Sequence, residues 1–251
     1  MKRAVAKKKK NRNWGRIFTI SVLISFIVPA GYLLVRIIGG ESLPEGAGGR
    51  VREDYVLMLL QCLLGVAAIL VPIKIMRRWD IEIPRVMFLM YIAFLYCAIF
   101  LGEVRSFYYT VPHWDTILHT FSGSMLGALG FSVVALLNNT EKIPMNLSPF
   151  FVAVFAFCFA MALGAVWEIY EFSADCLLGT NMQKFALDGG APLVGQEALR
   201  DTMKDIIVDA IGALVTSTIG YISIKYKTGW IDRLMIRTGR HKKTKDGENQ
   251  K

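Results

Sequence analysis

Apolar residues form six long runs along the chain, each close to the ~20 residues that a helix needs to cross a bilayer. These runs cover approximately residues 17–38, 55–76, 86–101, 116–137, 149–172 and 205–224. The stretches between them carry turn-forming and charged residues, such as the segment ESLPEGAGG after the first run. The pattern predicts an all-α fold, a polytopic helical membrane protein with about six transmembrane helices.

Composition supports this fold class, because 54% of the 251 residues are hydrophobic and only 20% are charged. Such a chain is too apolar for an ordinary soluble domain or a disordered protein. We expect a basic tail over residues 1–16, a membrane domain over 17–225 and a second basic tail over 226–251. In the second tail, Trp230, Ile231, Leu234 and Met235 recur at helical spacing, which fits either a short amphipathic helix or a disordered basic segment.

The distribution of the net charge of +9 predicts an orientation. If the amino terminus is cytoplasmic, the inner segments hold 22 Lys and Arg residues and the outer segments hold seven. Cytoplasmic flanks carry such an excess, so we expect a multi-pass protein of the cell membrane with both termini in the cytoplasm. Basic blocks beside apolar helices are typical of contact with anionic lipids and not of nucleic-acid binding. The pattern indicates no oligomeric state.

Ionisable residues inside apolar helices are costly and usually functional, and here they fall in three segments. All keep a spacing of three or four residues, which places the members of each group on one helix face. The groups are Asp115 with His119, Glu168 with Glu171 and then Asp175, and Asp201 with Asp205 and Asp209.

Topology brings these groups together, because the fourth, fifth and sixth runs all reach the outer surface where the groups lie. We expect a polar cavity with candidate catalytic residues His119, Glu168, Glu171, Asp205 and Asp209. Asp115 and Asp201 would lie at its mouth, and all seven are candidate metal ligands. Simpler roles remain open: Asp115 and Asp201 could be helix N-caps, His119 a packing residue and Asp175 a loop residue.

Tight packing of these three helices is expected from small residues at helical spacing. They are Gly123 and Gly127, Ala160 and Gly164, and Gly212, Thr216 and Gly220.

Crowded carboxylates in a partly dry site need either protons or a counter-charge. Lys204 is the basic residue nearest to them in sequence, and helical spacing directs it away from Asp205. Oxygen ligands with one imidazole suit Mg²⁺, Mn²⁺ or Ca²⁺, and Zn²⁺ is an alternative. Shared protons between the carboxyl groups are the other solution. The four cysteines show no CxxC spacing and therefore imply neither a zinc knuckle nor a disulfide framework.

The ordered motifs resemble those of the YjdF-like family of small bacterial membrane proteins, and more distantly those of VanZ-like proteins. The similarity covers roughly residues 100–220 and rests on Asp115-x3-His119-x3-Gly123, Glu168-x2-Glu171 and Asp201-Thr202-x2-Asp205-x3-Asp209-x2-Gly212. In some relatives the last acid of the third motif is asparagine, so Asp209 adds negative charge here. The resemblance implies a polytopic membrane protein and supplies no reaction.

Three functions remain open from the sequence. The first is a metal-dependent enzyme that acts on a lipid headgroup or a lipid-linked envelope precursor. The second is a transporter or binding protein for a cation, a proton or a small solute, and the third is a structural membrane protein. Walker, HExxH and Ser-His-Asp motifs are absent, which argues against familiar hydrolases. The absence of internal repeats argues against inverted-repeat transporters.

Overall fold

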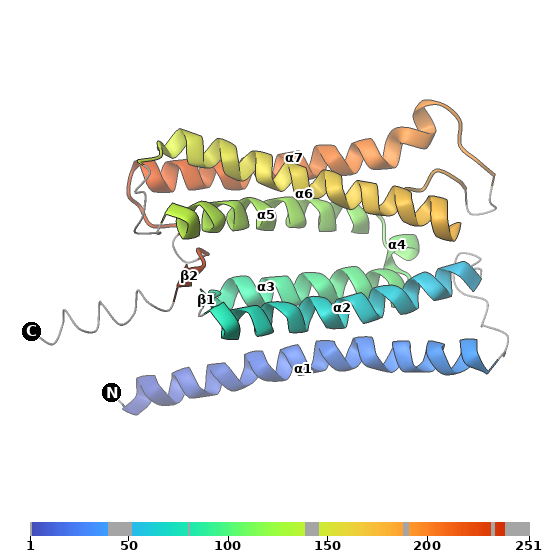
Figure 1. The fold of residues 1–251 in the computed structure, drawn as a ribbon, viewed down its shortest axis with the longest axis horizontal. Coiled ribbons are helices and arrows are strands. Elements are labelled where there is room, and N and C mark those ends of the chain that lie inside the picture. The colour runs from blue at the N-terminus through green and yellow to red at the C-terminus, as the bar shows by residue number, and fades with distance from the viewer. Residues whose placement is uncertain are drawn as a thin grey trace, which may run out of the picture.

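The computed structural model describes residues 2–39, 52–79, 81–138, 146–187, 191–231 and 234–238. Its elements follow one another along the chain as a series of long helices with two short strands (Figure 1). They are α1 (Lys2–Ile38), α2 (Arg52–Trp79), β1 (Ile81–Glu82), α3 (Arg85–Leu95), η1 (Tyr96–Val104), α4 (Phe107–Thr110), α5 (Trp114–Asn138), α6 (Pro149–Leu178), α7 (Gln196–Lys225) and β2 (Arg237–Thr238).

Within the part of the chain that the structure describes, six helical segments are long and apolar enough to cross a membrane, which confirms the predicted fold class. They are Trp14–Ile38, Tyr55–Trp79, Arg85–Val104, Trp114–Asn138, Pro149–Leu178 and Gln196–Lys225. The last two extend further toward the loop between them than the hydropathy pattern predicts, because polar residues continue both helices beyond their apolar parts. The loop expected between the fifth and sixth runs is therefore shorter, and Asp201 lies inside α7 and not at its start.

The helices form two groups that lie side by side (Figure 1). In the first group, α1, α2 and α3 share an apolar core that includes Val22, Phe26, Ile69 and Ile92. In the second group, α5, α6 and α7 run along one another. Burial of large apolar side chains holds the first group, whereas small residues dominate the contacts of the second.

Two glycines show how closely α5 and α7 approach. A Cβ atom added at Gly123 would lie 2.4 Å from the carbonyl oxygen of Asp209, and one added at Gly212 would lie 2.2 Å from the carbonyl oxygen of Thr120. Neither position can hold a larger residue without separating the helices. The predicted tight packing is confirmed, and it presses the polar starts of α5 and α7 against each other.

The third spanning segment changes its winding halfway. Its second part, η1, is a nine-residue π-helix that ends before Arg105. Ser106 then adopts a left-handed conformation, with φ of 63°, and the short α4 leads into α5. The hydropathy pattern contains no signal for this change. π-helical turns are rare in proteins overall, and those that occur often lie at functional sites.

The segment after α7 contains a short strand among its described residues, and residues 232, 233 and 239–251 of the second basic tail lie outside them. Ile231 is buried against α5 and α6, and its backbone N–H donates to Ser223 Oγ. Strand β2 then pairs with β1 in an antiparallel ladder. The start of α1, the end of α7 and this two-stranded ladder lie at one end of the bundle, and α4 with the start of α5 lies at the other (Figure 1).

Candidate functional site

The acidic groups lie at the end of the bundle where α5 begins, α6 ends and α7 begins. The side chains of His119, Glu168, Glu171, Asp205 and Asp209 are all buried there. Asp205 is only 1% exposed, although a buried carboxylate without a partner is strongly unfavourable. The position and burial of these residues therefore require partners or a bound ligand.

His119 is held between two aspartates. Its Nδ1 atom lies 3.3 Å from Asp209 Oδ2, and Ser122 Oγ donates to Asp209 Oδ1 over 3.0 Å. Since an ionised carboxylate only accepts hydrogen bonds, this contact places a proton on Nδ1. The Nε2 atom lies 3.7 Å from Asp115 Oδ1, which is too long for a hydrogen bond. The lone pair of Nε2 is then available to a ligand.

Asp115, His119 and Asp205 form a group that could hold a metal ion. Each offers one ligand atom, and these atoms lie within 4.8 Å of one another. Ligands about 2.0–2.6 Å from a common ion lie at most about 4–5 Å apart, so the group is close to a coordinating arrangement. Asp205 Oδ1 is buried and forms no hydrogen bond. The carboxylate of Asp209 on Nδ1 is the outer partner that a metal-bound histidine usually has.

Lys184 supplies a positive charge at this site, which corrects the expectation that no basic residue of the chain points toward the acids. The Lys184 ammonium forms ion pairs with Asp115 and with Asp201, the second over 3.2 Å. Burial by itself lowers the pKa of Lys184, but the neighbouring Asp115 and Asp201 carboxylates raise it above its ordinary value. Lys184 therefore carries its charge across the physiological range of pH. Its backbone φ of 47° shows that the loop holds it in a conformation unusual for a side-chain-bearing residue.

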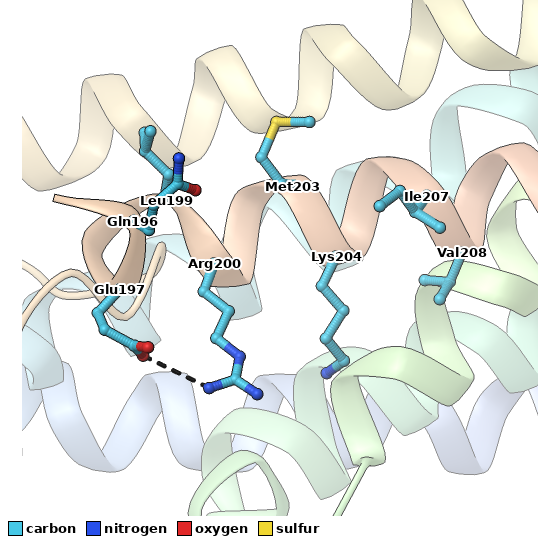
Figure 2. A pocket seen from close by; sticks show the side chains of 8 residues that line it. All are labelled: Gln196, Glu197, Leu199, Arg200, Met203, Lys204, Ile207 and Val208. Carbon is cyan, nitrogen blue, oxygen red and sulfur yellow. Dashed lines mark hydrogen bonds and ion pairs between the residues drawn. The ribbon is translucent and has the colours of Figure 1, made fainter.

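Lys204 lies on another face of α7. It lines a shallow depression of about 430 Å³ beside Arg200, which pairs with Glu197 on the surface (Figure 2). The sequence predicts that Lys204, between Asp201 and Asp205, points away from the acids, and its place beside Arg200 agrees with this prediction. Sequence reasoning missed Lys184 because that residue lies 17 positions before Asp201 and reaches it only through the path of the loop.

Asp175 anchors the loop that carries Lys184. Its carboxylate accepts hydrogen bonds from Thr180 Oγ1 and from the backbone N–H groups of Met182 and Gln183, at 2.6, 2.7 and 3.0 Å. Asp175 lies in the last turn of α6, and so the alternative that it is a loop residue is wrong. Its lone pairs are used by the loop, which gives Asp175 a positioning role.

Glu168 and Glu171 have different surroundings. Gln183 Nε2 donates to Thr202 Oγ1 over 2.9 Å and lies 3.5 Å from Glu168 Oε2, while Glu168 Oε1 is buried without a hydrogen bond. Glu171 Oε1 accepts a hydrogen bond from Trp167 Nε1 over 2.9 Å. Ser122, Trp167 and Gln183 are further site residues that the sequence does not identify, because uncharged polar residues are common at helix contacts.

A cavity of about 630 Å³ opens beside this cluster. Its walls include Asp115, His119, Glu171, Lys184 and Asp209. The other three acids of the cluster do not line it; they are Glu168, Asp201 and Asp205. The seven expected residues therefore divide into a set at the cavity and a set behind it, and Lys184 replaces Asp201 at the mouth.

Comparison with known proteins gives a family and no activity. The model of a family described as "Predicted membrane protein (DUF2238)" matches residues 47–226, which include every site residue described above. An "Uncharacterized protein" of Thermotoga maritima is 28% identical over 151 residues, which cover 59% of this chain and 67% of that protein. No solved structure matches the chain.

Proposed function

This chain belongs to the DUF2238 family of predicted membrane proteins, and we propose that it is a divalent-cation-dependent enzyme acting on the polar head of a membrane lipid or lipid-linked envelope precursor. The observation that carries the proposal is the group of Asp115, His119 and Asp205, which brings one ligand atom from each residue together beside a large cavity. We also propose the YjdF-like placement, because its three motifs fall within residues 47–226.

A cation explains two unused atoms at once. His119 Nε2 has no hydrogen bond to Asp115, and Asp205 Oδ1 has no hydrogen-bond partner. If protons alone neutralised the site, a protonated His119 would be expected to donate from Nε2 to an acid at hydrogen-bond distance. A bound ion would instead use the Nε2 lone pair and the free carboxylate oxygen together. Two carboxylates with one imidazole favour Mn²⁺, with Mg²⁺, Ca²⁺ or Zn²⁺ as alternatives.

Chemistry at the head of a lipid fits the position of the site. A bound divalent ion would act as a Lewis acid toward a phosphoryl or carbonyl oxygen. Within the chain, Lys184 would bind an anionic group at the mouth, since its side chain is 37% exposed. Glu171 lines the cavity and is oriented by Trp167, which suits it to accept a proton from the attacking group.

The packing beyond the cluster favours a site at one end of the bundle over a translocation path. Past Asp209, α5 and α7 meet at Gly127 with Thr216 and at Phe131 with Gly220. A Cβ atom added at Gly220 would lie 2.1 Å from the Phe131 ring, so this contact leaves no room for a solvated ion. A purely structural role would leave the unused oxygen of Asp205 without an explanation.

We place the site at the outer face of the cell membrane, with both termini in the cytoplasm. The basis is the division of basic residues into 22 on the terminal side and seven on the side of the site. The start of α1 and the end of α7 lie at the end of the bundle opposite to the cluster, which agrees with both termini lying on the side away from the site (Figure 1). Anionic lipids of the inner leaflet would then contact the basic tails.

The test is thermal unfolding of the purified protein with Mn²⁺ and with a chelator. At Mn²⁺ about 100-fold above its Kd, binding stabilises the folded state by about 2.7 kcal/mol, which for a chain of this size raises Tm by several degrees. Asp205→Asn should abolish the rise. Glu197→Gln, which removes an exposed carboxylate of the same helix, should keep it. Equal responses in the native protein and Asp205→Asn would overturn the proposal.

A further inference from the structure

The large cavity lies between the two helix groups. One wall comes from α2, α3 and η1, and the other comes from α5 and α6. Its volume of about 630 Å³ falls in the ~300–1,000 Å³ range of small-molecule sites. A metal ion with a few waters needs far less space, so the cation site by itself does not account for this cavity.

Polarity changes along the cavity in a fixed direction. On α5 the lining residues run from Asp115 and His119 through Ser122 to Met125 and Leu126. Asp115 and Leu126 are eleven residues apart, which corresponds to about 16 Å along the helix. The polar groups thus occupy the outer end, and the deeper part is apolar.

The antiparallel helix α6 shows the same change in the opposite chain direction. Its lining residues begin with Leu163 and Val166 and end with Trp167 and Glu171. Since α6 runs opposite to α5, Leu163 lies deep and Glu171 lies near the acidic cluster (Figure 1). Two helices of opposite direction therefore give the cavity one polar end and one apolar end.

The facing wall is mainly apolar and irregular. Its apolar residues include Leu64 and Ala68 of α2, Phe94 of α3, and Ala98 and Ile99 of η1, and it also carries Gln61 and Glu103. The π-helical winding of η1 is unusual in its nine-residue length, and π-helical turns accompany functional sites. The deeper part of the cavity is bounded mainly by apolar side chains, and the Tyr91 hydroxyl there donates to the Ala68 carbonyl oxygen.

We propose that this cavity receives the hydrocarbon chain of an amphiphilic substrate whose phosphate-bearing head lies at the Asp115 and Lys184 end. The inference rests on the proposed function for the head, and it adds that the substrate is chain-bearing and enters from the bilayer. A chain that passes from the bilayer into the apolar part stays out of water, whereas exposing it to water would cost about 0.8 kcal/mol per CH₂ group. A soluble phosphate ester would leave the apolar part unfilled and is therefore not the preferred substrate.

Photo-crosslinking with a dodecyl phosphate that carries a diazirine at the end of its chain tests this inference. The probe is added to the full-length protein in detergent micelles, and the labelled peptides are identified by mass spectrometry. Labels are expected in the cavity segments around Ala98 of η1 and around Met125 and Leu126 of α5. Labels found only on exposed helix faces would overturn the inference.

A pair of neighbouring alanines provides a matched control. Ala68 lines the cavity, whereas Ala67 is exposed on the outside of the same helix. Ala68→Trp should reduce cavity labelling at least tenfold, and Ala67→Trp should leave it unchanged. If Ala68→Trp does not fold, Ala98→Leu adds a smaller obstruction from η1 on the same wall and should reduce labelling in the same way. Equal labelling in the obstructed and control variants would contradict the assignment.

Unlabelled competitors separate two sources of the chain. A saturated alkyl phosphate represents glycerolipids, and a polyprenyl phosphate represents lipid-linked precursors. Whichever removes the cavity label more efficiently identifies the class of chain, and failure of both to compete overturns the inference. Failure of the cation proposal is recognised separately: cavity labelling would persist with chelator and in Asp205→Asn, while the Mn²⁺ effect on Tm would be absent.

Discussion

Replacing Lys184 by glutamine is the most informative single change at the site. Glutamine keeps much of the side-chain volume but removes the charge that Asp115 and Asp201 now share. The side chains of the two acids are only 17% and 14% exposed, while that of Lys184 is 37% exposed. Loss of one partner of a fully buried ion pair costs about 3–5 kcal/mol, and an exposed pair contributes about 0–1 kcal/mol. The intermediate exposure here gives an expected loss of about 1–3 kcal/mol.

The assay compares the free energy of unfolding of the native protein, Lys184→Gln and Lys204→Gln in mixed micelles. Lys204→Gln is the matched control. Lys204 lies near the start of α7, at the same end of the bundle as Lys184, and it makes neither of these ion pairs. The effect of Lys204→Gln should lie within about 0.5 kcal/mol of zero.

A divalent cation should restore part of the stability of Lys184→Gln, since it supplies positive charge to the same carboxylates. Removal of the competing ammonium should also tighten Mn²⁺ binding, and each 1.4 kcal/mol corresponds to a factor of ten in Kd.

The difference in the free energy of unfolding between the native protein and Lys184→Gln depends on pH with a defined sign. Because the pKa of Lys184 is raised above its ordinary value, the stability it contributes is fully present below about pH 10.4 and is lost as pH rises through the raised value. The difference between the native protein and Lys184→Gln should therefore stay constant from neutral pH to about pH 10. Equal stability of Lys184→Gln and Lys204→Gln at neutral pH would refute the assigned role of Lys184, and so would an equal response of all three proteins to Mn²⁺.

Two further predictions concern topology and packing. In a background with Cys158 and Cys176 changed to alanine, a membrane-impermeant thiol reagent applied to intact cells should label Leu187→Cys and not Thr228→Cys, and the reverse would place the site in the cytoplasm. Gly123→Leu should destabilise the bundle by at least about 1–3 kcal/mol, because its side chain would meet the backbone of Asp209. At Gly31 an added Cβ atom meets nothing within 4 Å, so Gly31→Leu should be nearly neutral in the same unfolding assay.

The sequence predicts the fold class and the convergence of the acids for the same reason. Apolar runs of bilayer length have few alternatives to spanning helices, and acids at spacings of three and four occupy one helix face. The alternating direction of the spans then sets the end at which Asp115, Glu168 and Asp205 lie. Their placement at one end of the bundle follows from local patterns alone.

Loop geometry and helix winding could not be predicted from local sequence patterns, because long-range contacts determine them. Lys184 reaches Asp115 across 69 residues, and it does so because Asp175 fixes the loop with three hydrogen bonds. No spacing rule relates these residues. The cavity likewise depends on how two helix groups meet and on the π-helical winding of η1, which an apolar sequence does not specify.

The arrangement of charges links the cation site to the lipid cavity. Asp115 contacts both Lys184 and His119, and so it connects the mouth of the cavity to the candidate cation ligands. An anionic head that binds Lys184 would weaken the ion pair between Lys184 and Asp115 and make an Asp115 carboxylate oxygen available to the ion. Conversely, an ion on Asp115 would release the ammonium toward the head. Cation and phosphate-headed amphiphile should therefore bind with positive cooperativity, and by linkage each should raise the affinity for the other by the same factor. In Lys184→Gln this coupling should fall, while cation binding by itself persists. Coupling of equal size in the native protein and in Lys184→Gln would show that the two ligands communicate by another route.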